Sequence, residues 1–211
     1  MIISERKISL DRRGCYIDPN FKKFGDSSLR ITGEDSVLLA SDEAQSPRFD
    51  SGAQIGYQFS SGILNEGSFC VDMWIRVDCN WLCKLWKFSN LSLDLLANGS
   101  LRLWERLGTV ILTTSAGVLS NDGNFHHIEV DENGDSYYIF IDGILIANGS
   151  STFRASLGNF GTDFGYGEFG SGWGSGAVYA FKGWIDEVRV SNIYRHTSGF
   201  TVPTESYLPD G

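Results

Sequence analysis

Short apolar or alternating runs, separated by clusters of Gly, Asn, Asp and Ser, recur along the whole chain. The segment 69–77 shows the pattern most clearly: Phe69 and every second residue after it are apolar, whereas the intervening positions are mixed and include Asp72 and Arg76. A period of two places successive side chains on opposite faces of a strand. The segment is therefore predicted to be a β-strand with one buried face and one mixed face.

The same periodicity predicts further strands over residues 82–88, 91–96, 101–105, 109–114, 125–130, 137–141, 144–147 and 183–191. Asn98-Gly99 and Asp142-Gly143 each lie between two of these strands. Asn-Gly is the strongest short hairpin signal, because both turn residues are expected at positive φ. Residues 131–135, Asp-Glu-Asn-Gly-Asp, are expected to form another turn. Consecutive hairpins of this kind are typical of an antiparallel β-sandwich.

Composition strengthens the all-β interpretation. The chain of 211 residues is 42% hydrophobic and 13% aromatic, which is enough to fill the space between two packed sheets. It contains 25 glycines and 4 prolines, a balance that favours many tight turns over disorder. No linker and no internal repeat is visible, so residues 1–211 are expected to form a single domain.

The charge pattern argues against nucleic acid and membrane as partners. The formal net charge is −9 and the 17 basic residues are scattered, whereas a nucleic-acid-binding protein clusters its basic residues against phosphates. Charged residues follow directly after Met-Ile-Ile-Ser, and no apolar run has the length of a secretory signal or a membrane-spanning helix. We therefore expect no membrane insertion and folding in a cytoplasm. An acidic balance fits plain solubility, with cation-binding acidic loops as the alternative.

The four cysteines are Cys15, Cys70, Cys79 and Cys83. The last two form a C-x3-C motif, which hints at zinc, but a second pair of ligands at matching spacing is missing. Cys70 lies in an apolar strand, where a free cysteine behaves as a small hydrophobic residue. Reduced structural thiols are the expected state, and a disulfide or a metal site are the alternatives.

Three segments carry motifs in a fixed order. Residues 23–33 read Lys-Phe-Gly-Asp-Ser-Ser-Leu-Arg-Ile-Thr-Gly, residues 125–147 contain Phe-His-His-Ile-Glu-Val and Ile-Asp-Gly-Ile-Leu-Ile-Ala, and residues 183–191 read Gly-Trp-Ile-Asp-Glu-Val-Arg-Val-Ser. In this order and at these separations, over residues 23–192, they resemble the laminin-G-like, or concanavalin A-like lectin/glucanase, family. That resemblance implies an all-β fold, a two-sheet antiparallel jelly-roll sandwich.

The resemblance gives mainly structural roles to the residues of these motifs. Phe125, which stands where the family usually has Trp, is expected in the core, and Asp142-Gly143 in a hairpin turn. Asp186 lies in an otherwise apolar strand. It is therefore expected to accept hydrogen bonds from nearby backbone or to pair with Arg189 or Arg30.

An enzyme is not expected. Glycoside hydrolases of this fold carry a pattern E-x-D-x-(x)-E on one strand, which puts carboxylates on one sheet face, and no such strand is recognised here. Asp131, where the family commonly has Thr, falls in the turn expected at 131–135. Asp186-Glu187 is expected to point its side chains to opposite faces, and structural anchoring is favoured for it over a catalytic or metal role. No Ser/His/acid arrangement, P-loop or dinucleotide fingerprint is present.

Glycan binding is a role that the resemblance favours. Tyr166, Phe169 and Trp173 lie among closely spaced glycines, and rings of this kind stack on the apolar faces of sugars. The alternative is that they cover the open end of the sandwich. Trp81 and Trp104 are expected either to line the concave sheet or to pack in the core.

Calcium is a possible cofactor of the same glycine-rich region. Asp163 and Glu168 supply hard oxygen ligands from loops, which suit Ca²⁺. The spacing is not that of an EF-hand, so no known calcium motif supports the assignment.

The end of the chain suggests a setting for such a domain. Residues 194–204 resemble the Ala-Arg-Tyr-Thr-x-x-Phe-x-Pro-Pro-Thr ending of laminin-G-like domains in tailed-phage virion proteins, with His196 in place of Tyr. The resemblance implies a virion surface component, either a capsid decoration or a tail-associated protein. It would be made in the host cytoplasm, bind other virion proteins and cell-surface glycans, and assemble as a homo-oligomer or on the particle. A stand-alone carbohydrate-binding lectin is the alternative.

Overall fold

The computed structural model describes backbone and side chains of residues 67–78, 80, 82–87, 91–105, 108–153, 181–205 and 207. It describes the backbone alone of Phe88 and of the strands at 9–11, 15–18, 30–32, 36–39, 46–49, 54–58 and 166–169. Every regular element in this part of the chain is a β-strand, so the predicted all-β class is confirmed.

The first eight strands are β1 (Ser9–Asp11), β2 (Cys15–Asp18), β3 (Arg30–Thr32), β4 (Ser36–Leu39), β5 (Ser46–Phe49), β6 (Gln54–Gln58), β7 (Ser68–Val77) and β8 (Cys83–Phe88). They are followed by β9 (Leu91–Leu95), β10 (Leu101–Glu105), β11 (Val110–Thr113), β12 (His126–Asn133), β13 (Ser136–Ile141), β14 (Ile144–Ser150), β15 (Tyr166–Phe169) and β16 (Gly183–Ser191).

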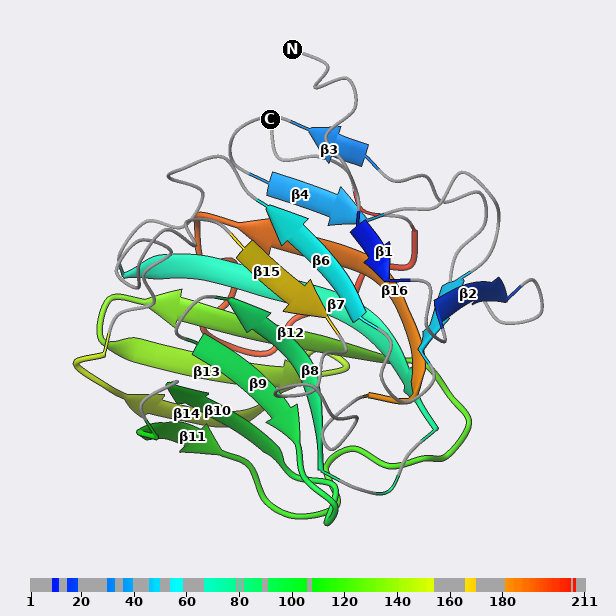
Figure 1. The fold of residues 1–211 in the computed structure, drawn as a ribbon. Helices are drawn as coiled ribbons and strands as arrows, with labels where there is room; N and C mark the ends of the chain where they lie inside the picture. Colours follow the sequence, from blue (N-terminus) through cyan, green and yellow to red (C-terminus); the bar gives the residue numbers. More distant parts are fainter. Residues whose placement is uncertain are drawn as a thin grey trace.

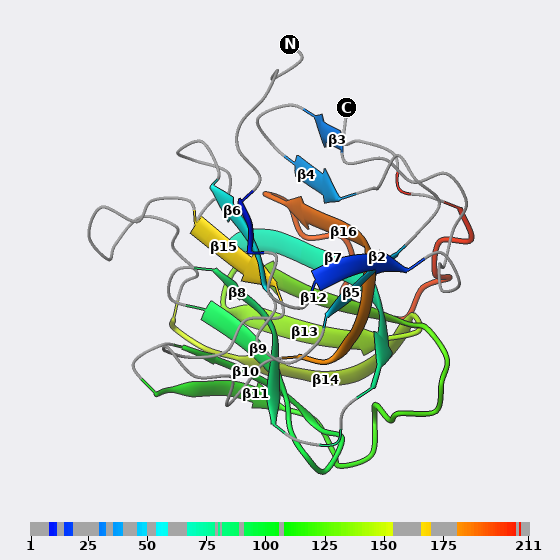
Figure 2. The same cartoon turned by 45° about the vertical axis from the view of Figure 1, so that its right-hand side comes forward.

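The strands form two antiparallel sheets in two layers (Figure 1). One sheet has seven strands in the order β1-β6-β15-β8-β9-β10-β11. The other has nine, along the path β14-β13-β12-β7-β16-β4-β3, with β5 paired to β16 and β2 paired to β5. Figure 2 shows the layers from a second direction, with β8, β9 and β10 in one and β7, β12 and β13 in the other. The sandwich predicted from the sequence is confirmed.

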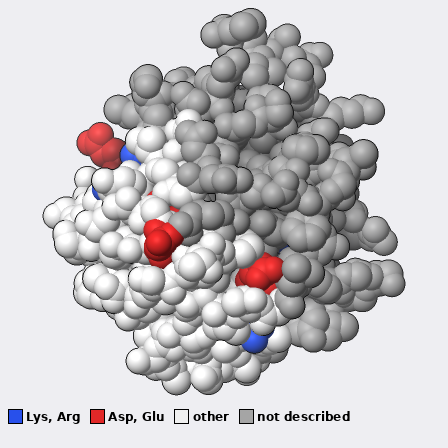
Figure 3. Space-filling model, turned by 90° about the vertical axis from the view of Figure 1, so that its left-hand side faces the viewer, with Lys and Arg blue, Asp and Glu red and all other residues white. Residues whose placement is uncertain are grey.

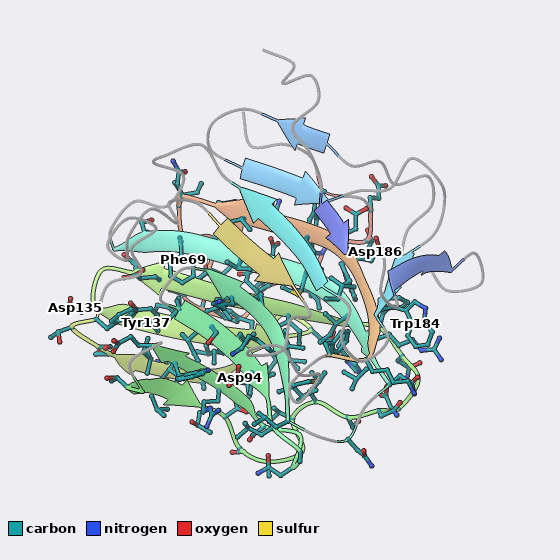
Figure 4. The ribbon with its side chains drawn as sticks, in the orientation of Figure 1. Phe69, Asp94, Asp135, Tyr137, Trp184 and Asp186 are labelled. Carbon is teal, nitrogen blue, oxygen red and sulfur yellow. The ribbon has the colours of Figure 1, made fainter. Side chains whose placement is uncertain are left out.

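The core fills the space between the sheets. Its fully buried members include Met73 of β7, Trp86 of β8 and Leu103 of β10. Phe69 and Tyr137 also meet there, with ring centroids 6.5 Å apart in an edge-to-face arrangement, and Figure 4 shows them near one end of the nine-stranded sheet. This geometry is favourable for aromatic pairs.

Strand β7 has the two faces that its sequence predicts. Phe69 and the alternate residues after it belong to the core cluster between the sheets. The opposite face, which carries Asp72 and Trp74, is buried as well. That second face points away from the seven-stranded sheet, so something else must cover it, and the cover is described below.

Strand β12 is longer than the sequence predicts. Asp131 and Glu132 were expected in a turn, but both lie in the strand, fully buried, and pair with Cys70 and Phe69 of β7. The turn begins only at Gly134, whose φ is 61°. The expected turn was wrong because two neighbouring strands, β7 and β13, supply hydrogen bonds that hold these polar residues extended.

The tight turns follow the sequence with one difference. Asp142 and Gly143 both have positive φ, 51° and 76°, as a two-residue hairpin turn requires. At the Asn98-Gly99 turn only Gly99 has positive φ, and the backbone N–H of Leu96 donates to Ser100, which leaves a three-residue loop. A three-residue hairpin loop uses a single left-handed residue.

On the face seen in Figure 3, the described acidic side chains lie in separate small patches. No helix among the described residues has the length and apolar character needed to cross a membrane.

Candidate functional site

The outward face of the seven-stranded sheet carries a charged cluster. Because β8, β9 and β10 are paired in register, Lys84 lies beside Asp94, and Asp94 beside Arg102. Ser92 and Trp104 form the next outward pair along the same strands. The residues between them, such as Leu93 and Leu103, turn inward to the core. We call Lys84, Ser92, Asp94, Arg102 and Trp104 the outward cluster.

Asp94 organises this cluster. Its Oδ1 accepts a hydrogen bond from Lys84 Nζ at 2.7 Å and its Oδ2 one from Arg102 Nη2 at 2.8 Å. Asp94 and Lys84 are almost fully buried, whereas 30% of the Arg102 side chain is exposed. Burial lowers the pKa of Lys84, and the charge of Asp94 opposes that shift. Figure 4 shows Asp94 on β9.

The half-buried indole of Trp104 lies beside the two cations. Lys84 Nζ is 5.0 Å and Arg102 Cζ 5.3 Å from the ring centroid, within the range of cation–π attraction. Lys84 and Arg102 therefore both contact the ring, and hydrogen bonds to Asp94 hold these two side chains in position. A rigid aromatic surface beside partly exposed guanidinium donors is suited to bind a ligand that has both apolar and hydroxyl faces.

A second charged cluster lies on the outward face of the nine-stranded sheet and is buried. Arg189 donates to both carboxylate oxygens of Asp72, at 3.1 Å from Nε and 2.6 Å from Nη2. His127 Nε2 lies 2.7 Å from the Tyr207 hydroxyl and 3.7 Å from Asp72 Oδ2. Burial favours the neutral acid, but the neighbouring side chains of His127 and Arg189 outweigh it and lower the pKa of Asp72.

The segment 192–207, which we call the covering segment, lies over this face. Phe200 packs edge-to-face on Phe140, with centroids 5.3 Å apart, and stacks on His196 at 3.7 Å. Tyr207 packs against Trp74, and its backbone N–H donates to Glu187 Oε2 at 2.9 Å. These contacts make the segment the outer cover of the sheet.

Two acids of β12 lie under the same cover. Glu129 and Asp131 are two positions apart on one strand face and are 1% and 0% exposed. His196 Nδ1 is 2.6 Å from Glu129 Oε1, and the backbone N–H of Arg195 donates to Asp131 Oδ1 at 2.6 Å. Burial raises the pKa of both acids, that of Glu129 to about 11. Strand β12 therefore places two carboxylates on one face, where a turn was expected at Asp131, but the third acid of the pattern E-x-D-x-(x)-E is absent, because Asn133 and Gly134 stand there.

The motif acids of β16 are anchored by a bulge. Asp186 is buried and accepts the backbone N–H of Glu187 at 2.9 Å, as predicted. Arg189, the expected partner of Asp186, instead pairs with Asp72. Glu187 has φ 48° in a register shift of the strand, and it reaches Tyr207 on the outward face. The expectation that the two acids point to opposite faces was wrong, because the bulge adds a residue to the alternation.

Phe125 lies outside the main core. It is partly buried and packs against the smaller cluster of Trp74 and Tyr207. The prediction of a core aromatic is corrected to one that closes the outward face. Asp142 does more than turn the chain: its Oδ1 accepts the His127 backbone N–H at 2.9 Å, and its Oδ2 lies 2.7 Å from His126 Nδ1.

Several predicted binding residues lie outside the described side chains. Trp81, Asp163 and Trp173 fall in positions that the structure does not describe. For Tyr166, Phe169 and Glu168 the backbone alone is described, in β15 between β6 and β8 of the seven-stranded sheet. The calcium assignment therefore stays a prediction. Of the predicted ligand-binding set, Trp104 is the member whose side chain is placed, on the outward face.

Sequence reasoning missed the partners of Trp104. Lys84, Asp94 and Arg102 are spread over three strands, and only their register brings them together. A usable signal existed for Asp94 and Arg102, which alternate with leucines along β9 and β10. Cys70 is a buried thiol outside any disulfide, as predicted, and Cys83 is buried as well.

Comparison with protein families identifies the fold. The family model described as the concanavalin A-like lectin/glucanases superfamily, of the laminin-G type, matches residues 50–197. The chain belongs to this family. Comparison with proteins of curated function finds no match.

Solved structures share the fold at low identity. Domain 4 of AbnA, a GH43 extracellular arabinanase from Geobacillus stearothermophilus in complex with arabinotriose, gives a TM-score of 0.54 at 14% identity and covers 90% of this chain and 95% of that one. The Ruminococcus gnavus IT-sialidase CBM40 bound to α2,3 sialyllactose gives 0.55 at 14%, covering 71% and 91%. A mutant of Trypanosoma rangeli sialidase gives 0.54 at 14%, but this chain, itself covered to 81%, spans 30% of that enzyme. The likeness shows that this chain shares the overall fold of these structures.

Proposed function

We propose that the protein is a non-catalytic carbohydrate-binding module and that the outward cluster on the seven-stranded sheet binds the sugar. The observation that carries the proposal is Trp104, a half-buried indole held beside the donors of Arg102 on a sheet face of a lectin-like fold. Sugars place their C–H faces on such rings, while fixed polar groups orient their hydroxyls.

The ion pairs give the cluster its rigidity. One oxygen of Asp94 accepts a hydrogen bond from Lys84 and the other accepts one from Arg102 Nη2. The bond at Nη2 holds the Arg102 guanidinium in place. The Arg102 side chain is 30% exposed, although its Nε is buried. A site that is already ordered loses less conformational entropy when a ligand binds.

The absence of catalysis is supported by the burial of the described acids. Glu129 and Asp131 share a strand face as catalytic pairs do, but they are 1% and 0% exposed beneath the segment 192–207. Asp94, on the other sheet, has both oxygens in ion pairs. A general acid or nucleophile must reach the glycosidic bond, and none of these three carboxylates is placed to do so.

Neutral and acidic oligosaccharides are the two classes of sugar to compare as ligands. The two similar carbohydrate-binding structures contain arabinotriose and sialyllactose. Among the described residues that point outward from β8, β9 and β10, the cations Lys84, Lys87 and Arg102 outnumber the anion Asp94. This balance favours glycans that carry a carboxylate.

A glycan array tests the proposal. Wild-type protein should bind a set of glycans, and Trp104→Ala should lose them. Tyr138→Ala is the matched control, because Tyr138 is a half-buried aromatic on the outward face of the other sheet. Absence of glycan binding by the wild type, or equal binding by Trp104→Ala, would reject the proposal.

We further propose a virion surface as the setting of this module. The support is the resemblance of residues 194–204 to the ending of tailed-phage laminin-G-like domains, together with the exposure of Ile193 and Tyr194, at 51% and 43%, where that segment begins. Neighbouring exposed apolar side chains suit contact with another protein.

Co-sedimentation with phage capsids or tails tests the setting, and analytical ultracentrifugation tests the homo-oligomer. Ile193→Asp should weaken assembly without changing glycan binding. A chain that stays monomeric and ignores the particles would contradict this setting and leave the proposed sugar site to be judged by the array.

A further inference from the structure

Three side chains that can bind a metal ion converge beneath the segment 192–207. Glu129 and Asp131 come from β12, and His196 comes from the covering segment. One ligand atom from each lies within 4.8 Å of the others. The arrangement joins two elements that are far apart in sequence.

Two oxygens in this group have no hydrogen-bond partner among the described residues: Glu129 Oε2 and Asp131 Oδ2, both from fully buried side chains. The other oxygen of each carboxyl group has a partner: Glu129 Oε1 contacts His196 Nδ1, and Asp131 Oδ1 accepts a hydrogen bond from the Arg195 backbone N–H. A buried acceptor without a partner costs free energy, and two adjacent buried acids repel each other whenever both are ionised. A cation bound between them removes both costs.

Two neighbouring basic side chains have their contacts elsewhere. Arg189 makes its two short hydrogen bonds to Asp72, and the His127 imidazole contacts the Tyr207 hydroxyl. Glu129 and Asp131 therefore have other hydrogen-bond partners than Asp72, although an oxygen of Asp72 lies within 4.8 Å of one of Glu129.

We propose that Glu129, Asp131 and His196 bind a divalent transition-metal ion, with Zn²⁺ as the best match. The donor set of two carboxylates and one imidazole suits Zn²⁺, whereas Ca²⁺ takes oxygen ligands alone. Ligands of a tetrahedral zinc ion lie about 3.4 Å apart, given zinc–ligand bonds of about 2.1 Å. The three ligand atoms, all within 4.8 Å of one another, need only a small contraction to reach that spacing.

The surroundings also suit a metal ion. Cys70 lies opposite Asp131 in the strand register and is a free thiol, so a fourth, soft donor is at hand. The His196 side chain is 34% exposed, so an ion can enter from solvent without unfolding the sheet. Bound metal would tie the covering segment to β12, and so stabilise the fold by mass action.

Calorimetric titration with ZnCl₂ after chelator treatment is the test. Wild-type protein should bind one Zn²⁺ per chain, and its melting temperature should rise with added Zn²⁺ but not with Ca²⁺. Glu129→Gln and Asp131→Asn keep the size of each side chain and should weaken binding more than tenfold. His196→Gln should do the same.

His126→Gln is the matched control. His126 also lies between two carboxylates, Asp142 and Asp122, but each contacts a different ring nitrogen, so the ligand atoms do not converge. This variant should keep zinc binding. Absence of stoichiometric binding in the wild type, unchanged binding in correctly folded Glu129→Gln and Asp131→Asn, or equal loss in His126→Gln would overturn the proposal. Glycan binding plays no part in these readouts.

Discussion

At Asp72 a single carboxylate holds three strands together. Its own strand is β7, its ion-pair partner Arg189 belongs to β16, and the neighbouring His127 belongs to β12. All three lie on a face that is buried although it points away from the core between the sheets. Removing one partner of a buried, hydrogen-bonded pair leaves the other charge without compensation, which is why such pairs are costly to break.

Asp72→Asn is therefore expected to lower the free energy of unfolding by about 3–5 kcal/mol. The control is Asp78→Asn, because Asp78 pairs with Lys182 at 3.1 Å with both side chains 33% exposed. A solvated pair of that kind contributes about 1 kcal/mol or less. Urea unfolding of the two variants would measure the difference, and equal losses would contradict the account.

His126 should make stability depend on pH. Burial lowers its pKa, but the hydrogen bond and charge of Asp142, and then those of Asp122, outweigh burial and raise the pKa above 6.5. A raised pKa in the folded state stabilises the protein below the unfolded value, and this contribution is lost as the pH rises through the folded value. Between about pH 6 and about pH 8, wild type should lose more stability than His126→Gln. If the free energy of unfolding of the two proteins changed with pH in parallel, the contacts of His126 with Asp142 and Asp122 would not be the cause of a pH-dependent stability.

Gly143 has a steric role that goes beyond its turn. A Cβ atom there would lie 2.1 Å from the Phe200 carbonyl oxygen, and the residue has φ 76°. Gly143→Ala should therefore cost more than the roughly 1–2 kcal/mol expected for a left-handed alanine alone. Gly117→Ala isolates that smaller cost, since Gly117 has φ 73° and open space around its Cβ position. Thermal unfolding that ranks the two variants equally would exclude the contact with Phe200 as a cause.

At the scale of elements, a strand could be predicted where the alternation of its own residues was sufficient to define it. Strand β7 could be read from its alternation because its inward positions are all apolar. The end of β12 could not, since Asp131 and Glu132 are turn-forming residues that become extended only between β7 and β13. The bulge at Glu187 was equally hidden, because a non-glycine residue at positive φ leaves no mark in sequence periodicity.

The covering segment 192–207 is the element whose removal should matter most. Deleting residues from Phe200 onward would uncover Phe140, Trp74 and the buried Asp72 pair. We expect a fall in melting temperature of more than about 10 °C, because several buried contacts are lost at once. Thr204→Ala, an exposed change in the same segment, is the control. Differential scanning calorimetry would decide, and a truncated chain that melts like the full one would contradict the covering role.

At the scale of the whole molecule, the sandwich separates two kinds of polar chemistry. The nine-stranded sheet buries its charged side chains under the covering segment. The seven-stranded sheet also buries Lys84 and Asp94, but it leaves Trp104 and Arg102 partly exposed. The sequence left Trp104 open between the concave sheet and the core. It could not supply the ion pairs of Asp94 that hold the ring in place, because cross-strand partners depend on register rather than on spacing.

The most direct test of the sugar site is to see which sheet the ligand touches. Backbone ¹H–¹⁵N NMR spectra of the protein would be recorded during titration with the strongest glycan from the array. The account predicts that shift changes gather on β8, β9 and β10 around Trp104. Changes gathered on β12 and β13, or spread without preference over both sheets, would contradict it.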